Sequence, residues 1–278
     1  MHPILISVPG GGWAVYADGA AKGLALLVAW LIALDRARRD GLPTEVLGAI
    51  FVVAAAAGLL GARALWLVGH PELATGFGAL LQLPAGGLSL VGGAFAALLT
   101  TALGCRLRGV STFAWLDCVA PGFAAGAAIE RLGAFLAGAD FGRYVAPGEW
   151  GYALAVTFPA GSPAHSVHVQ LLDGLGVVSD AASAPVHPVQ IYAAVLALIA
   201  LGLALWLRPR RRYAGQVALA VLAFFVVARL GVEDPLRFDG TEPVWGALRR
   251  GHVAALGLLG VIAGVARVQR RAAERGSA

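Results

Sequence analysis

Long apolar runs separated by short charged stretches constrain the fold of this chain more than any other feature of its sequence. A helix that crosses a bilayer needs about 17–25 predominantly apolar residues, and seven runs of roughly this length follow one another along the chain. They lie at about 18–34, 45–69, 86–104, 113–129, 188–207, 214–231 and 252–267. The sequence therefore predicts an all-α polytopic membrane protein with about seven transmembrane helices, which form a single domain over residues 1–278.

The composition agrees with a membrane location. Hydrophobic residues make up 59% of the chain and charged residues only 13%, whereas soluble domains carry roughly 25% charged residues. The net charge of +5 could suggest a nucleic-acid partner, but most of the arginines gather in short clusters between the apolar runs. This distribution is typical of a topology signal, so no nucleic-acid partner is expected.

The arginine clusters predict the orientation of the chain. If every run spans, the clusters that follow the first, third, fifth and seventh runs all lie on one side. They are Arg36, Arg38 and Arg39; Arg106 and Arg108; Arg208, Arg210, Arg211 and Arg212; and Arg267, Arg270, Arg271 and Arg275. Because positive residues favour the cytoplasmic side, we expect the N-terminus outside and the C-terminus inside.

Residues 138–187 differ from the rest of the chain, because Gly, Pro, Asp, His and Trp interrupt short apolar stretches there. Long loops in compact proteins are usually functional or disordered, and the apolar residues within 152–158 favour an ordered segment. We expect a small extracytoplasmic insertion between spans four and five, with one or two strands or turns.

Three arginines, Arg63, Arg131 and Arg229, lie in or at the edge of apolar runs. A charge at bilayer depth costs about 2.5–3.5 kcal/mol on insertion scales, so three charges of one sign predict a positive pocket. Near lipid, the natural ligand of such a pocket is an anionic lipid headgroup.

Each arginine also has a purely structural interpretation. Arg63 could extend its guanidinium group to the outer interface. Arg131 could form a local ion pair with Glu130 at the outer end of the fourth span. Arg229 and Glu233 are spaced i, i+4 and can pair on one helix face, either to lower the cost of burial or to orient Arg229 toward a phosphate.

Two further segments could serve either packing or binding. Four glycines within 86–93 let a backbone or a ligand approach closely, with packing the simpler interpretation. His187 precedes Pro188 at the start of the fifth span, where a histidine is more often a cap or loop residue than a catalyst. The six histidines are scattered, with no carboxylate at ligand spacing, so no metal and no bound cofactor are expected.

Taken together, these segments resemble the bacterial phosphatidylglycerol–prolipoprotein diacylglyceryl transferases. The matching pieces occur in the order of the family over about residues 15–265, and the ordered set is more specific than any one motif. They are Gly61-Ala62-Arg63; Gly86-Gly87-Leu88-Ser89 with Gly92-Gly93; Asp117 to Pro121; Arg131-Leu132-Gly133 followed by Gly142-Arg143; Pro185-Val186-His187-Pro188-Val189-Gln190-Ile191-Tyr192; and Arg229 to Glu233.

The sequence departs from the usual family pattern at several polar positions. Val91 stands where members of the family usually have His, and Ala134 where they usually have Asn. Asp18 takes the place of a Tyr in the first span. The usual Glu before the second half of the signature looks like Ala139, with Asp140 next.

The resemblance implies transfer of the diacylglyceryl group of phosphatidylglycerol to the lipobox cysteine thiol of a secreted prolipoprotein, with release of glycerol-1-phosphate, in the bacterial inner membrane. Arg131, Arg229 and Glu233 are the expected catalytic residues: the arginines would bind the lipid phosphate, and Glu233 would hold Arg229. The general base stays open among Glu233, Asp18 and Asp140. Residues expected to bind lipid or substrate are Arg131, Arg63, Gly142, Arg143, His187, Gln190 and Tyr192.

Two other interpretations stay open. A paralogue with the same fold could bind anionic lipid without turnover or modify another acceptor, and the departures at Val91, Ala134 and Asp18 favour it. A transporter or channel for a small anion is the third, but we find no inverted repeat and no paired broken helices in the sequence.

Overall fold

A computed structural model describes residues 4–7, 14–82, 87–172, 178–238, 243–245 and 248–276. Within these residues, seven helices are long and apolar enough to cross a membrane. The prediction of an all-α polytopic membrane protein is confirmed, and the chain is a multi-pass membrane protein. Its orientation stays a prediction, and Gly86 of the glycine-rich segment lies outside the described residues.

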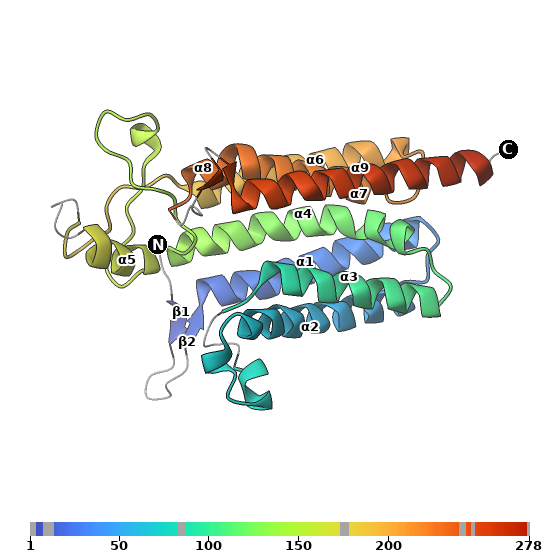
Figure 1. Cartoon of the computed structure of the whole chain (residues 1–278), viewed down its shortest axis with the longest axis horizontal. Helices are drawn as coiled ribbons and strands as arrows, with labels where there is room; N and C mark the ends of the chain where they lie inside the picture. Colours follow the sequence, from blue (N-terminus) through green and yellow to red (C-terminus); the bar gives the residue numbers. More distant parts are fainter. Residues whose placement is uncertain are drawn as a thin grey trace. The chain divides into compact units, whose positions relative to one another are not determined.

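The helices alternate with short connections and two small hairpins (Figure 1). The α-helices are α1 (Ala17–Arg39), α2 (Thr44–Val68), α3 (Leu90–Leu107), α4 (Thr112–Ala137), α5 (Pro163–Leu172), α6 (Val189–Leu207), α7 (Gln216–Ala228), α8 (Asp234–Leu236) and α9 (Arg250–Gly276). The 3-10 helices are η1 (Pro71–Leu73), η2 (Phe77–Leu80), η4 (Tyr152–Leu154) and η6 (Arg208–Arg210), and η7 (Arg229–Glu233) is a π-helix. Strand β1 (Ile4–Ser7) pairs with β2 (Ala14–Tyr16), and β3 (Pro243–Trp245) pairs with β4 (Leu248–Arg249), each pair antiparallel.

Helix α4 continues well beyond the predicted end of the fourth span at residue 129. The charged pair Glu130-Arg131 ends the apolar run, but helix-favouring residues continue to Ala137. The helix stops at Gly138, whose positive φ of 71° suits only glycine readily. The turn is a Schellman motif, in which the Ala139 amide donates to the carbonyl oxygen of Ala134 at 2.9 Å.

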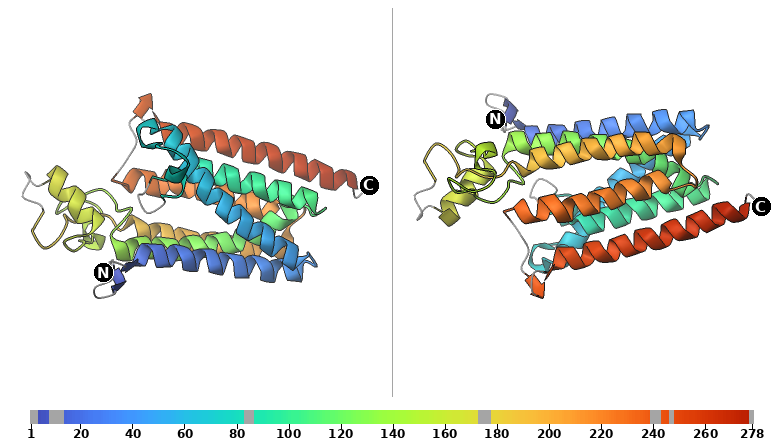
Figure 2. Two further views of the ribbon diagram at one scale, coloured as in Figure 1. Left: turned by 90° about the horizontal axis from the view of Figure 1, so that it is seen from below. Right: turned by 90° about the horizontal axis from the view of Figure 1, so that it is seen from above.

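The chain divides into two compact units, a larger one (Met1–Leu31 with Val119–Ala278) and a smaller one (Ile32–Cys118). In the smaller unit, α2 and α3 lie side by side (Figure 2). Glycines make this close approach possible, since a Cβ on Gly61 would collide with Ala96, and one on Gly92 would collide with the Gly61 carbonyl. Gly92 and Gly93 of the glycine-rich segment therefore serve helix packing. The single domain expected from the sequence stays a prediction.

Small residues also line the helix contacts of the larger unit. Gly122, Gly126 and Gly133 on α4 lie against the part of α1 that carries Ala21 and Ala29. A second contact joins α4, α6 and α7 through buried small side chains. Its members are Ala120, Ala124, Ala200, Ala204, Val217 and Val221. Without a hydrophobic driving force between helices in lipid, such close van der Waals packing is what holds them together.

The described residues of the 138–187 segment lie beyond one end of α4 around a small apolar core, against which Phe135 and Phe238 also pack (Figure 1). The core consists of Phe141, Phe158, Ala164 and Val186. Isolated β-bridges occur, as at Val156–Val186, and the extracytoplasmic insertion itself stays a prediction. The sequence prediction missed helix α5. It begins with a recognisable signal, because the Ser162 hydroxyl accepts the His165 amide at 3.2 Å and Pro163 occupies the first helical position.

His168 of α5 is fully buried among aromatic rings. Its ring centroid lies 5.1 Å from that of Phe141 and 5.5 Å from that of Phe238. Both ring nitrogens lack a hydrogen-bond partner within the described structure. Burial lowers the pKa of His168 below its ordinary value, and the nearby His165 lowers it further.

This lowered pKa predicts a loss of stability in acid. Below a pH of about 6.5, His168 is protonated in the unfolded chain but stays neutral in the folded protein. The free energy of unfolding therefore falls as the pH drops toward the folded pKa. Phenylalanine at position 168 should fit the aromatic cluster. We expect His168→Phe to reduce the fall in melting temperature between pH 7.5 and pH 5. Each kcal/mol of unfolding free energy that the variant retains at pH 5 should raise its melting temperature there by about 2–4 °C. Thermal denaturation in detergent measures this. His70→Gln, which removes a titratable ring outside this aromatic cluster, is the control. An unchanged pH dependence in His168→Phe would contradict the prediction.

Candidate functional site

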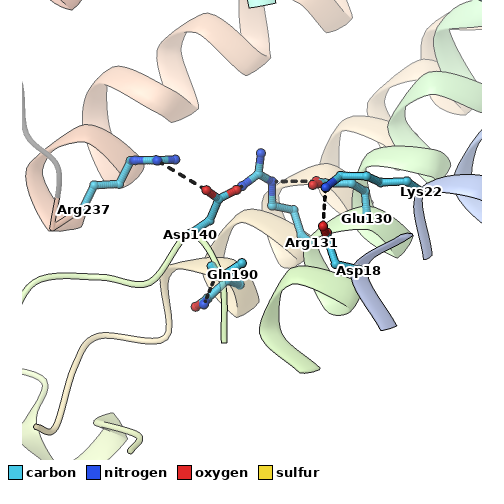
Figure 3. Close-up of polar contacts among 8 residues, drawn as sticks. Asp18, Lys22, Glu130, Arg131, Asp140, Gln190 and Arg237 are labelled. Atoms are coloured by element: carbon cyan, nitrogen blue, oxygen red, sulfur yellow. Dashed lines mark hydrogen bonds and ion pairs between the residues drawn. The ribbon is translucent and has the colours of Figure 1, made fainter. Parts of the chain in front are cut away.

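The turn after α4 returns the chain to Arg131 and surrounds its guanidinium group with carboxylates. Arg131 Nη1 donates to Asp140 Oδ2 at 3.0 Å, and Arg131 Nε lies 3.1 Å from Glu130 Oε2 (Figure 3). The local ion pair with Glu130, which was one interpretation of the sequence, therefore forms. It forms together with a second, longer-range pair that the sequence interpretation did not include.

Asp140 also faces a second arginine. Its Oδ1 lies 3.7 Å from Arg237 Nη2, so one carboxylate bridges two guanidinium groups from different elements (Figure 3). Asp140 has φ of 51° and is the one non-glycine residue with positive φ within the described ranges. Aspartate tolerates this conformation better than most residues do. Backbone conformation thus turns its side chain toward the arginines.

A backbone junction brings Arg237 to this point. The Arg143 amide donates to the Leu236 carbonyl at 2.7 Å, and the Gly142 amide donates to the His187 carbonyl at 3.2 Å. Gly142 also forms an isolated antiparallel bridge with Arg237. Any Cβ at Gly142 would lie 2.8 Å from the Cβ of His187, so only glycine allows the segments to approach. Gly142 and Arg143 act here through their backbones, and the Arg143 side chain is exposed.

The first two turns of α1 add two further charges. Lys22 and Asp18 form an ion pair, and Figure 3 shows Lys22 directed toward Glu130. Positive and negative side chains thus alternate from Lys22 through Glu130, Arg131 and Asp140 to Arg237.

The expected pairing of Arg229 with Glu233 is wrong. Arg229 Nε lies 3.2 Å from Asp234 Oδ1, five residues along the chain. The reason is the π-helix η7, in which the Asp234 amide donates to the Arg229 carbonyl, so i and i+5 rather than i and i+4 share a face. Glu233 is half-buried and forms no ion pair among the described residues, and its carbonyl oxygen accepts the Arg237 amide at 2.9 Å.

Three polar side chains beside the junction have buried hydrogen-bonding atoms that are unused; His187 and Gln190 are buried, and Tyr192 is half-buried. Both ring nitrogens of His187, Gln190 Oε1 and the Tyr192 hydroxyl lack partners within the described structure. Gln190 Nε2 donates to the Ala139 carbonyl at 2.6 Å and so anchors the turn that carries Asp140. Buried polar groups without partners are rare and usually meet a ligand or water.

His187 is not a helix cap, because Pro188 occupies that position and no side-chain capping bond forms. Its ring packs under Trp150 and beside Tyr192, with centroid distances of 5.7 and 6.3 Å. Burial lowers the pKa of His187 below its ordinary value. The charge of Arg143 lowers it further, whereas Glu149 acts in the opposite direction. The ring is therefore neutral near pH 7, with one nitrogen able to accept a hydrogen bond.

Arg63, in the smaller unit, is only 3% exposed, so its guanidinium group is enclosed by protein. Its Nε donates to the Ala79 carbonyl at 3.0 Å and its Nη1 to the Gly87 carbonyl at 3.2 Å. The guanidinium group also lies over the Trp66 ring, 4.9 Å from the centroid. Arg63 thus fixes the connection between α2 and α3.

We did not predict Arg237 or Lys22 as site residues from the sequence. The signal available for Arg237 was its position shortly after the sixth apolar run. The helical segment continues through α8 to Leu236, and the backbone becomes extended at Arg237, where the chain turns back. The contact with Asp140 depends on two turns far apart in sequence, which no local pattern reports. The resulting cluster of guanidinium groups suits an anion, since arginine forms charge-assisted, bidentate hydrogen bonds with phosphate.

Comparison with known proteins identifies the family of the chain. The sequence profile of the family described as prolipoprotein diacylglyceryl transferase matches residues 3–269. Similar proteins include phosphatidylglycerol–prolipoprotein diacylglyceryl transferases of Thermus thermophilus, 28% identical over 86% of this chain and 85% of that protein, and of Geobacillus kaustophilus, 27% identical over 88% and 84%. The transferase of Xylella fastidiosa is 32% identical over 63% of this chain and 60% of its own length. The family profile covers nearly the whole chain, which therefore belongs to the prolipoprotein diacylglyceryl transferase family.

Proposed function

We propose that this chain transfers the diacylglyceryl group of phosphatidylglycerol to the thiol of a lipobox cysteine in a secreted prolipoprotein. The observation that carries the proposal is the convergence of Arg131 and Arg237 on the single carboxylate of Asp140, in a member of this family. We infer that the protein lies in the bacterial inner membrane, with its N-terminus and the 138–187 insertion outside. There it would meet both phosphatidylglycerol and an emerging signal peptide.

In the proposed reaction, the lipobox sulfur attacks the diacylglyceryl carbon that bears the phosphate oxygen. A carbon–sulfur bond forms, the carbon–oxygen bond breaks, and glycerol-1-phosphate leaves with the bonding electron pair. Negative charge grows on the leaving phosphate, and preorganised guanidinium groups stabilise it. Arg131 and Arg237 would contact the phosphate directly. Arg229, half-exposed and held by Asp234, would supply further positive charge.

Glu233 is the proposed general base. The other two carboxylates considered from the sequence are engaged in ion pairs, Asp18 with Lys22 and Asp140 with Arg131 and Arg237. Each would have to break a pair before it could take a proton. Glu233 has no cation partner in the described chain, so its carboxylate is available to accept the proton of the thiol.

The buried polar groups beside the junction are proposed to bind the glycerol headgroup. His187, Gln190 Oε1 and Tyr192 OH offer acceptors and donors that match hydroxyl groups. Arg63 is proposed to act separately, within the smaller unit, by holding the connection from α2 to α3, since backbone carbonyls already occupy its Nε and Nη1.

A second candidate function rests on the missing polar residues. Ala134 is 1% exposed, and Val91 is 71% exposed; neither can act as an acid, a base or a hydrogen-bonding side chain. A paralogue that binds anionic lipid without turnover, or that modifies another acceptor, would keep the arginines but lose the polar side chains expected at positions 91 and 134. Complementation of a strain depleted of its own transferase separates the two functions, because only an active transferase restores growth at normal expression.

The phosphate role predicts a large effect of truncating the arginines. We expect Arg131→Ala to lower the transfer rate about 100- to 1,000-fold, as loss of one charge-stabilising donor does elsewhere, and Arg229→Ala to lower it as well. A purified assay with phosphatidylglycerol and a lipobox peptide measures this. Arg270→Ala is the matched control, because Arg270 forms an exposed ion pair with Glu274 on α9. Full activity in Arg131→Ala or Arg229→Ala would refute the assignment.

The base role predicts a pH-dependent defect. We expect Glu233→Gln to lower the rate by about 100- to 10,000-fold near pH 7 and to recover as the pH passes about 8.5, where a free thiol ionises unaided. Asp234→Asn is the comparison variant, because it acts through Arg229 and should show a defect without that recovery. A Glu233→Gln defect of the same size at every pH would exclude Glu233 as the base.

A further inference from the structure

We propose that the Asp140 carboxylate is a built-in occupant of the phosphate site, which holds Arg131 and Arg237 in position and is displaced by the phosphate of the incoming lipid. This inference rests on the proposed function, because it takes the two arginines as phosphate ligands. It adds to that function an internal competitor that sets the affinity of the site for anionic lipid.

The position of the carboxylate is that of a bound anion. One oxygen of Asp140 lies 3.0 Å from Arg131 Nη1, and the other lies 3.7 Å from Arg237 Nη2. Two oxygens of one phosphate group engage a pair of guanidinium groups in the same manner. A phosphodiester carries a single negative charge, as the carboxylate does, so the exchange leaves the net charge of the site unchanged.

The exposures of the three side chains show which partner can leave. The Arg237 side chain is 15% exposed and that of Arg131 26%, whereas that of Asp140 is 41% exposed. The arginines are therefore the enclosed members, and the carboxylate faces outward. Exposed ion pairs are weak because water solvates the separated charges well, and the 3.7 Å contact exceeds hydrogen-bond length.

The turn that carries Asp140 fits this role. Gln190 Nε2 holds the Ala139 carbonyl at 2.6 Å, and the Schellman turn fixes the chain up to this residue. The backbone of the turn is thus secured by bonds that do not involve the Asp140 side chain. The carboxylate can rotate away from the arginines while the turn stays in place.

Asp140→Asn tests the exchange, since asparagine has nearly the same size and also tolerates positive φ. We expect the variant to bind short-chain phosphatidylglycerol about three- to tenfold more tightly, because the lipid no longer displaces a charged competitor. Binding to the detergent-solubilised protein and the KM for the same lipid in the transfer assay measure this. Asp35→Asn, which removes a carboxylate paired with Arg39 on α1, should leave the affinity unchanged.

Unchanged or weaker binding in folded Asp140→Asn would overturn the proposal, and so would equal tightening in Asp35→Asn. If Asp140→Asn does not fold, Asp140→Gly keeps the positive φ without strain and should tighten binding in the same way. Lipid binding by Arg131→Ala shows whether a negative result rejects only the exchange of Asp140 for phosphate or also the proposed function. Loss of lipid binding in Arg131→Ala without tightening in Asp140→Asn rejects only the exchange. Retained binding in Arg131→Ala rejects the phosphate site itself.

Discussion

A guanidinium group within an apolar helix bundle needs an anion or backbone carbonyls beside it, and the partners of the arginines organise this molecule. Arg131 and Arg237 share the carboxylate of Asp140, and Arg229 is held by Asp234. Arg63 instead takes carbonyl oxygens and an aromatic face. In the first arrangement the partner is a carboxylate, which another anion can replace. In the second, the guanidinium group donates its hydrogen bonds to backbone carbonyl oxygens, which an anion cannot readily replace. This difference is why we assign phosphate binding to the first group and a positioning role to Arg63.

The apolar runs predicted the helices well, because length and hydropathy alone decide which segments can span. They predicted the ends of α4 and α7 poorly. The charges at Glu130-Arg131 end the apolar run but not the helix, which continues to Ala137. The π-helix at Arg229–Glu233 makes Asp234, rather than Glu233, the partner of Arg229. The contact of Asp140 with Arg237 joins segments almost a hundred positions apart, so no spacing rule reports it. The candidate site was thus predictable in its residue types but not in its pairing.

The structure shows what Ala139, Asp140 and Asp18 do at the positions where the sequence departs from the usual family pattern. The residue that follows the Schellman turn, rather than the one within it, faces Arg131. Ala139 at the inner position gives its carbonyl to Gln190, and Asp140 presents the carboxylate. Asp140 thus supplies Arg131 with a carboxylate in this chain. At the start of α1, Asp18 forms an ion pair with Lys22.

Mass spectrometry of a lipobox peptide, incubated with the purified protein and phosphatidylglycerol of defined acyl chains, tests directly whether the arginine cluster supports transfer of a diacylglyceryl group to a cysteine thiol. We expect a peptide heavier by one diacylglyceryl group at the cysteine, formed together with an equal amount of glycerol-1-phosphate. An unmodified peptide, in a preparation that binds phosphatidylglycerol and is folded, would contradict the proposed transfer and favour a lipid-binding paralogue.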